Sequence, residues 1–266
     1  MGENKKTRGG GDDGKILTSS EGYIYQIGFD RAAKYNGFSP LMLQQLAEAY
    51  TEFEQNDQYR VAVIYGVGDN FCAGLDLSKT KLDTGLFPTN CVDPFNLRPP
   101  YRTKPLVVAE QGICYTLGVE LALAADIVVA AENTRFSQLE VKRGVIAFGG
   151  ATIKMVERAG WGNAMRYLLT GDEWDAETAV KLGFVQEIVK TGEQLEKAMA
   201  LAETISRQAP LAVKAMIESA RIAQLEGQAQ AIVAFQSQMN ILKSSDDYRE
   251  GIQSFLERRD GEFTGK

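Results

Sequence analysis

The sequence predicts an α/β core followed by a helical C-terminal region, and two patterns in the 266-residue chain support this. Apolar runs typical of buried strands alternate with amphipathic helices in the first two thirds of the chain. From Gln194 onward only helical periodicity remains. The change of pattern places a boundary near residues 192–208. We therefore expect a core over 16–205 and a helical region over 206–266.

Capping residues and periodicity place the individual elements. Ser39 followed by Pro40 predicts the start of a helix that continues to about Glu54. A compact helix is expected between two apolar runs of the segment 105–140. The expected strands are 23–29, 61–65, 105–109, 126–131 and 184–189. The expected C-terminal helices are 194–207, 210–224, 227–242 and 246–258.

Composition narrows the class of protein. Residues 1–15 are polar and Gly-rich, with no apolar core of a signal peptide, so we expect a disordered tail. The net charge of -6 disfavours nucleic acid and membrane surfaces as partners. No apolar run reaches the roughly 18 residues that span a bilayer. Three cysteines without a disulfide or metal-binding pattern favour a reducing, cytoplasmic location.

The sequence contains no histidine. This absence excludes Ser-His and Cys-His catalysis and disfavours a zinc site, so no metal is expected. Acid–base chemistry would fall to Glu, Asp, Lys, Tyr or Cys.

Two carboxylates, Glu120 and Glu140, lie in the apolar segment 105–140. A buried acid requires a partner or a function. Without a function, Glu120 would be a charge favoured by a helix N-terminus, and Glu140 a solvated loop acid. Before this segment, the Gly-containing loop 66–77 follows a strand and can present backbone N–H groups. These groups and those of the helix start before Glu120 could together bind a developing negative charge, although an ordinary loop is the alternative.

Five motifs in order resemble the crotonase (enoyl-CoA hydratase/isomerase) superfamily, and the enoyl-CoA hydratases most of all. The similarity extends from about Tyr23 to Phe263. The motifs are FCAGLDL, GICYTLGVELALAAD, SQLE, GVIAFGGAT and EGIQSFLERRDGEF. The resemblance implies a spiral of ββα units with a C-terminal helical trimerisation region. It also implies acyl-CoA thioester substrates, and assembly as a homotrimer or a dimer of trimers.

The resemblance also assigns roles at the site. The backbone N–H groups of Leu75, which follows Ala73 and Gly74, and of Leu117 would form an oxyanion hole for the thioester oxygen. Glu120 would act mainly on the water and Glu140 would mainly deliver a proton. The family usually has Gly where this chain has Leu117. Many members also have Pro before the second glutamate, where this chain has Leu139.

Further residues match positions that contact coenzyme A in relatives. Phe255 and Arg258 match positions that often reach the CoA of a neighbouring subunit, and their alternatives are packing and a solvated charge. Arg31 and Lys34 are candidates for the CoA phosphates, with plain surface charge as the alternative. Asp76 is expected to fix the loop that contains Leu75. No cofactor is expected beyond the CoA of the substrate.

The sequence therefore predicts an enoyl-CoA hydratase. The alternatives on the same fold are an enoyl-CoA isomerase, an acyl-CoA hydrolase, or a non-catalytic RNA-binding or assembly protein. Isomerases and hydrolases usually keep fewer of the two glutamates, so Glu120 argues against them. The net negative charge argues against RNA binding. The retained glutamate pair argues against a silent protein.

Overall fold

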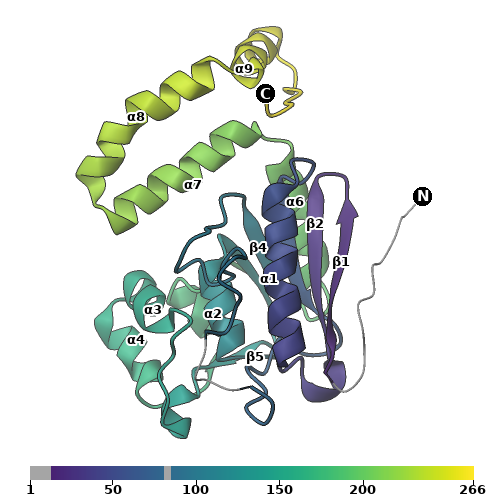
Figure 1. Ribbon diagram of the computed structural model, residues 1–266, viewed down its shortest axis with the longest axis vertical. Coiled ribbons are helices and arrows are strands. Elements are labelled where there is room, and N and C mark those ends of the chain that lie inside the picture. Colours follow the sequence, from purple (N-terminus) through teal and green to yellow (C-terminus); the bar gives the residue numbers. More distant parts are fainter. Residues whose placement is uncertain (1–12, 81–84) are drawn as a thin grey trace.

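The computed structural model describes residues 13–80 and 85–266 (Figure 1). Most of the expected disordered tail, 1–15, lies outside the described residues, and Lys15 is the first residue of a strand. Among the described residues, no helix is long and apolar enough to cross a membrane.

A six-stranded sheet forms the centre of the molecule. Its first two strands form an antiparallel hairpin, and every later pairing is parallel. In spatial order the strands are β1 (Lys15–Glu21), β2 (Ile24–Asp30), β3 (Val61–Gly66), β4 (Leu106–Glu110), β6 (Ile127–Ala131) and β9 (Glu187–Val189). The five expected strands are all present, whereas β1 lacks the apolar alternation that would have predicted it.

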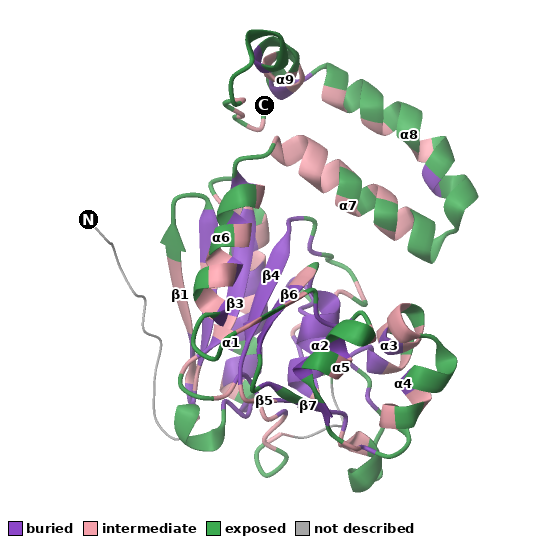
Figure 2. Cartoon of the chain, turned by 180° about the vertical axis from the view of Figure 1, so that it is seen from behind, coloured by how far each residue is buried: buried purple, intermediate pink, exposed green. Residues whose placement is uncertain are grey.

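Both faces of the sheet are covered, which explains its continuous apolar runs. Along β3, Val61 and Val63 pack with Ala198 and Ala202 of α6 (Gln194–Ser206). The alternate residues of β3 face the core on the other side, with α1 (Pro40–Gln55). Figure 2 shows these central strands as buried.

Side-chain caps mark two of the helix starts, and the cap at Ser39 was predicted from the sequence. The Ser39 side chain accepts a hydrogen bond from the backbone N–H of Met42 at the start of α1. Asp175 accepts one from Thr178 at the start of α5 (Ala176–Lys181). The C-terminal helices have nearly the predicted bounds; after α6 they are α7 (Pro210–Leu225), α8 (Gln228–Lys243) and α9 (Asp246–Glu257). Helices α7 to α9 extend away from the sheet, while α6 packs on it (Figure 1).

A second, small sheet positions the site. It consists of β5 (Ile113–Tyr115), β7 (Arg135–Ser137) and β8 (Trp174–Asp175), in that order. Strand β5 leads into α2 (Leu117–Ala124), which is buried along its whole length. Strand β7 leads into the short 3-10 helix Glu140–Arg143, and α3 (Ala151–Ala159) and α4 (Trp161–Leu168) follow. Because β5 and β7 are paired, the two segments that carry Glu120 and Glu140 leave the same sheet side by side.

Candidate active site

The loop with the FCAGLDL motif is held directly beside β5. Cys72 donates its backbone N–H to the Ile113 carbonyl at 2.9 Å, and its own carbonyl accepts from Tyr115 at 2.8 Å. These two bonds form a parallel bridge between Cys72 and Cys114. The two segments that were predicted from the sequence to provide N–H donors therefore lie next to each other.

The two expected oxyanion donors are oriented by their neighbours. The Gly74 carbonyl and the Asp76 N–H both bond to Phe38, at 2.8 and 2.9 Å. The Leu75 N–H shares a trans peptide group with the Gly74 carbonyl and points in the opposite direction, away from Phe38. Leu117 is the first residue of α2, where N–H groups have no partner within the helix. Both N–H groups are thus available to a ligand.

One cavity brings the central predictions together. A cavity of about 210 Å³ is lined by Ala73, Leu75, Leu117, Glu120 and Glu140. The rest of its described lining is mostly apolar: Leu77, Leu86, Thr116, Leu139, Arg143, Val145 and Phe148. Such a cavity fits an apolar chain next to a small polar reaction centre.

Close contact between the two donor segments depends on glycine. Gly74 has a φ of +98°, and a Cβ built on it would lie 1.9 Å from Thr116 Oγ1. A Cβ on Gly118 would lie 3.0 Å from the Cβ of Cys72. Larger residues at either position would push the FCAGLDL loop away from the start of α2.

Glu120 is 4% exposed, in the first turn of α2. Its Oε1 accepts the backbone N–H of Ala151 at 3.3 Å. Gly149 lies so close that a Cβ there would be 2.3 Å from Glu120 Oε2. Burial raises the pKa of Glu120 to about 8, with a smaller contribution from the charge of Glu140, against the stabilising backbone N–H groups. Burial therefore favours the protonated form of Glu120.

Glu140 is half-buried at the start of the 3-10 helix, and burial raises its pKa to about 7. The buried Gln138 orients it. With the amide nitrogen of Gln138 facing the carboxylate, that nitrogen donates to Glu140 Oε2 at 2.7 Å and to Oε1 at 2.9 Å. Gln138 belongs to the SQLE motif, but its role is not recognisable from the sequence, because the spacing of residues does not reveal where an amide side chain points.

Arg31 forms an ion pair with Asp76 of the FCAGLDL loop. Arg31 is 6% exposed, and its Nη1 lies 2.9 Å from Asp76 Oδ2. It also donates to the Gly37 carbonyl at 2.8 Å. Hydrogen bonds from Ser78, followed by the charge and hydrogen bond of Arg31, lower the pKa of Asp76. These contacts fit the loop-fixing role expected for Asp76, and we now interpret Arg31 as a positioning group for the same loop.

Lys34 remains beside this loop as an exposed cation. It ends the 3-10 helix Ala32–Lys34, and the carbonyl of the next residue, Tyr35, accepts the backbone N–H of Ala73 at 2.9 Å. Phe255 and Arg258 lie elsewhere. Phe255 is 80% exposed on α9, at the opposite end of the molecule from α2 (Figure 1). One chain therefore does not bring these two residues to the cavity.

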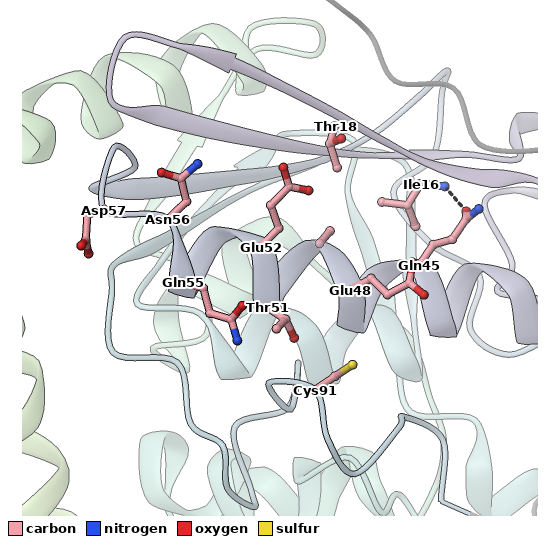
Figure 3. Close-up of a pocket in the computed structure, with 11 residues that line it drawn as sticks. Ile16, Thr18, Gln45, Glu48, Thr51, Glu52, Gln55, Asn56, Asp57 and Cys91 are labelled. Atoms are coloured by element: carbon pink, nitrogen blue, oxygen red, sulfur yellow. Dashed lines mark hydrogen bonds between the residues drawn. The ribbon is translucent and has the colours of Figure 1, made fainter.

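A larger cavity of about 600 Å³ lies between β1 and α1 (Figure 3). Its described lining includes the acids Glu48, Glu52 and Asp57 and no Lys or Arg. An acidic lining repels a phosphorylated ligand such as CoA. None of the predicted site residues lines it, so the smaller cavity is the candidate active site.

Comparison with known proteins decides the family. The family model described as enoyl-CoA hydratase/isomerase matches residues 19–266. The chain belongs to the enoyl-CoA hydratase/isomerase family. The structure of a probable enoyl-CoA hydratase/isomerase from Mycobacterium abscessus is similar, with a TM-score of 0.92 and 46% identity. The similarity covers 94% of this chain and 98% of that one. It confirms the expected crotonase-like α/β fold with a helical C-terminal region.

Relatives of this family member carry the names of different activities. It is 31% identical to the 1,2-epoxyphenylacetyl-CoA isomerase of Escherichia coli, over 94% of this chain and 98% of that one. It is 30% identical to the 2,3-dehydroadipyl-CoA hydratase of the same organism, over 95% and 99%. The reaction of this enzyme must therefore be argued from its own site.

Proposed function

We propose that this family member is an enoyl-CoA hydratase, which adds water reversibly across the 2,3 double bond of a 2-enoyl-CoA. The proposal rests on one observation. Glu120 and Glu140 line the same cavity as Leu75 and Leu117, whose N–H groups are the expected oxyanion donors. Hydration needs both a proton acceptor and a proton donor, and an oxyanion site for the charge that develops on the thioester oxygen.

The geometry supports the following reaction. The two backbone N–H groups hold the thioester oxygen and polarise the conjugated double bond, so that C3 becomes electrophilic. One glutamate takes a proton from the water as its oxygen bonds to C3. The other glutamate gives a proton to C2. The raised pKa values, about 8 for Glu120 and about 7 for Glu140, favour a protonated member of the pair near neutral pH, and this reaction requires one proton donor.

The division of roles between the glutamates is a separate question. The family resemblance assigns Glu120 to the water and Glu140 to proton delivery. The electrostatics of the cavity favour the reverse, because burial raises the pKa of Glu120 further and the amide nitrogen of Gln138, when it faces Glu140, donates to the Glu140 carboxylate. The pH dependence of the two Gln variants decides between them: loss of the base removes the acidic limb of the profile.

The remaining expectations form part of the same proposal. The mainly apolar cavity lining favours an apolar acyl group. No cofactor is needed beyond the CoA of the substrate. The exposed apolar residues of α8 and α9 favour a homotrimer or a dimer of trimers, in which Phe255 and Arg258 would reach a neighbouring cavity. An isomerase is the second candidate, because a relative at 31% identity carries an isomerase name.

The test follows the absorbance of the conjugated thioester with crotonyl-CoA and with longer and aromatic enoyl-CoAs. We expect the wild type to bleach at least one of them and to form a product heavier by one water. Because positioned acid–base groups contribute about 10²–10⁴-fold, Glu120→Gln and Glu140→Gln should each lower kcat by at least about 100-fold. Glu177→Gln, on the exposed face of α5, is the matched control.

The outcomes separate the candidates. No bleaching across the panel would disprove the hydratase, and a product of unchanged mass with a shifted double bond would indicate an isomerase. Full activity in both Gln variants would show that the catalytic assignment is wrong.

A further inference from the structure

Thr116 has a backbone conformation that β-branched residues rarely adopt, with φ 49° and ψ -110°. Hydrogen bonds hold it in place. Its N–H donates to the Ser137 carbonyl at 2.8 Å, and its carbonyl accepts the Glu120 N–H at 3.0 Å. Residues held in such conformations are concentrated at functional sites. The conformation of Thr116 therefore suggests that its side chain has a functional role.

The hydroxyl of Thr116 lies beside the segment that carries the first expected oxyanion donor. A Cβ on Gly74 would lie only 1.9 Å from Thr116 Oγ1, so the hydroxyl is packed against Gly74. Leu75, which carries the first N–H donor, follows Gly74. Leu117, which carries the second, follows Thr116 itself. Thr116 also lines the cavity with Glu120.

This hydroxyl is available to a ligand. Within residues 13–80 and 85–266, the hydrogen bonds of Thr116 are those of its backbone, and no partner meets its Oγ1. By contrast, the hydroxyl of the buried Ser137, at the end of the paired strand, donates to the Gly171 carbonyl at 3.0 Å. A threonine hydroxyl carries one proton to donate. At Thr116 that proton can point into the cavity without giving up a protein contact.

We propose that the Thr116 hydroxyl donates a third hydrogen bond to the thioester oxygen of a bound acyl-CoA, beside the N–H groups of Leu75 and Leu117. The inference rests on the proposed acyl-CoA chemistry of this cavity. The hydrogen bond strengthens as negative charge builds on the oxygen, so it acts in the transition state more than in substrate binding. Thr116 keeps its proton throughout. The competing explanation is that the side chain only packs against Gly74.

The kinetic test compares Thr116→Val with Thr116→Ser, using crotonyl-CoA or the enoyl-CoA that the wild type hydrates fastest. Valine keeps the volume and loses the hydroxyl, whereas serine keeps the hydroxyl. We expect valine to lower kcat about tenfold, with little change in KM, since one hydrogen bond differs. Serine should stay near the wild type. Thr204→Val, on the exposed face of α6, is the matched control.

A second readout needs binding alone. Butyryl-CoA labelled with carbon-13 at the thioester carbonyl cannot be hydrated, and its carbonyl resonance shifts when donors polarise it. We expect a smaller shift in Thr116→Val than in the wild type or in Thr116→Ser. Thr116→Gly relieves the positive φ and should fold at least as stably as the wild type. It should nevertheless show the kinetic loss of the valine variant.

Each outcome bears on the proposal. A wild-type kcat and carbonyl shift in the valine or glycine variant would overturn it, as would a serine variant as impaired as valine. If the wild type hydrates no enoyl-CoA, the hydratase proposal fails, while the carbonyl shift still decides the role of Thr116. If valine prevents folding, the serine and glycine variants decide.

Discussion

At the scale of single residues, the site depends on carboxyl groups that the fold does not favour in their charged form. Glu120 is buried beside a second acid, and its main stabilising contact is the Ala151 N–H. A group whose pKa is raised on folding destabilises the protein as it ionises. Such a cost is typical of residues retained for chemistry.

We therefore predict that Glu120→Gln gains stability as it loses activity. The pKa of Glu120 rises on folding from an ordinary value of 4.5 to about 8. Wild-type stability from this group is complete below the lower value and falls as the pH rises through the higher one. Urea unfolding near pH 8 should show the variant more stable by about 1–3 kcal/mol, with little difference near pH 4. Equal stability at both pH values would contradict the burial argument.

A second residue-scale prediction concerns Gly74→Ala. The added methyl would overlap Thr116 Oγ1 and displace the Leu75 N–H, so kcat should fall by about 100-fold, the typical cost of one oxyanion donor. Gly22→Ala is the matched control. Its φ of +55° is also positive, but a Cβ there would meet no atom within 4 Å. Gly22→Ala should lose some stability and keep kcat, whereas equal kcat values in the two variants would contradict the close approach.

The sequence identified some site residues and not others for a physical reason. Glu120 and Glu140 are recognisable because their motifs are continuous in the chain. The contacts of Gln138, Gly149 and Ala151 depend on which loops meet, and no local pattern encodes that. Arg31 shows the same limit. From the sequence alone, a charged side chain is expected on the surface, and only the fold brings its partner Asp76 beside it.

At the scale of elements, long and strongly patterned segments were predictable and short ones were not. Helix α1 and the helices after Gln194 have clear periodicity and caps, and the structure confirms them. Strand β1 is polar on much of its length, and β8 has two residues. The small sheet that aligns the two glutamates is therefore visible only in three dimensions, because its strands are stabilised by tertiary pairing.

The cap of α1 gives an element-scale prediction. Ser39 Oγ accepts the Met42 N–H at 3.3 Å and donates to the Asp13 carbonyl at 2.6 Å. Ser39→Ala should lower the free energy of unfolding by about 1 kcal/mol. Ser244→Ala, at an exposed helix end where the hydroxyl bonds only locally, is the control and should change it less. Equal losses in urea unfolding would show that the cap contributes nothing specific.

At the scale of the whole molecule, the helices beyond the core expose apolar surface that contacts within one chain leave unburied. Helix α7 has no buried residue, and α8 buries only Ala231 (Figure 2). On α8, Ile232, Val233 and Phe235 are 55%, 74% and 51% exposed. Apolar surface of this kind typically marks a contact between subunits. This supports the proposed trimer, in which α9 would carry Phe255 towards another active site.

The last prediction joins assembly to substrate binding. Val233→Glu would place a charge in the proposed contact, so sedimentation velocity should show a shift from the wild-type assembly towards monomer. Gln58→Glu adds the same charge at an exposed turn after α1 and should leave the assembly unchanged. If Phe255 and Arg258 contact CoA across subunits, the dissociated variant should also show a higher KM for acyl-CoA. Phe255→Ala should raise KM without dissociation. An intact Val233→Glu assembly would contradict the interface, and a dissociated variant with the wild-type KM would contradict the shared site.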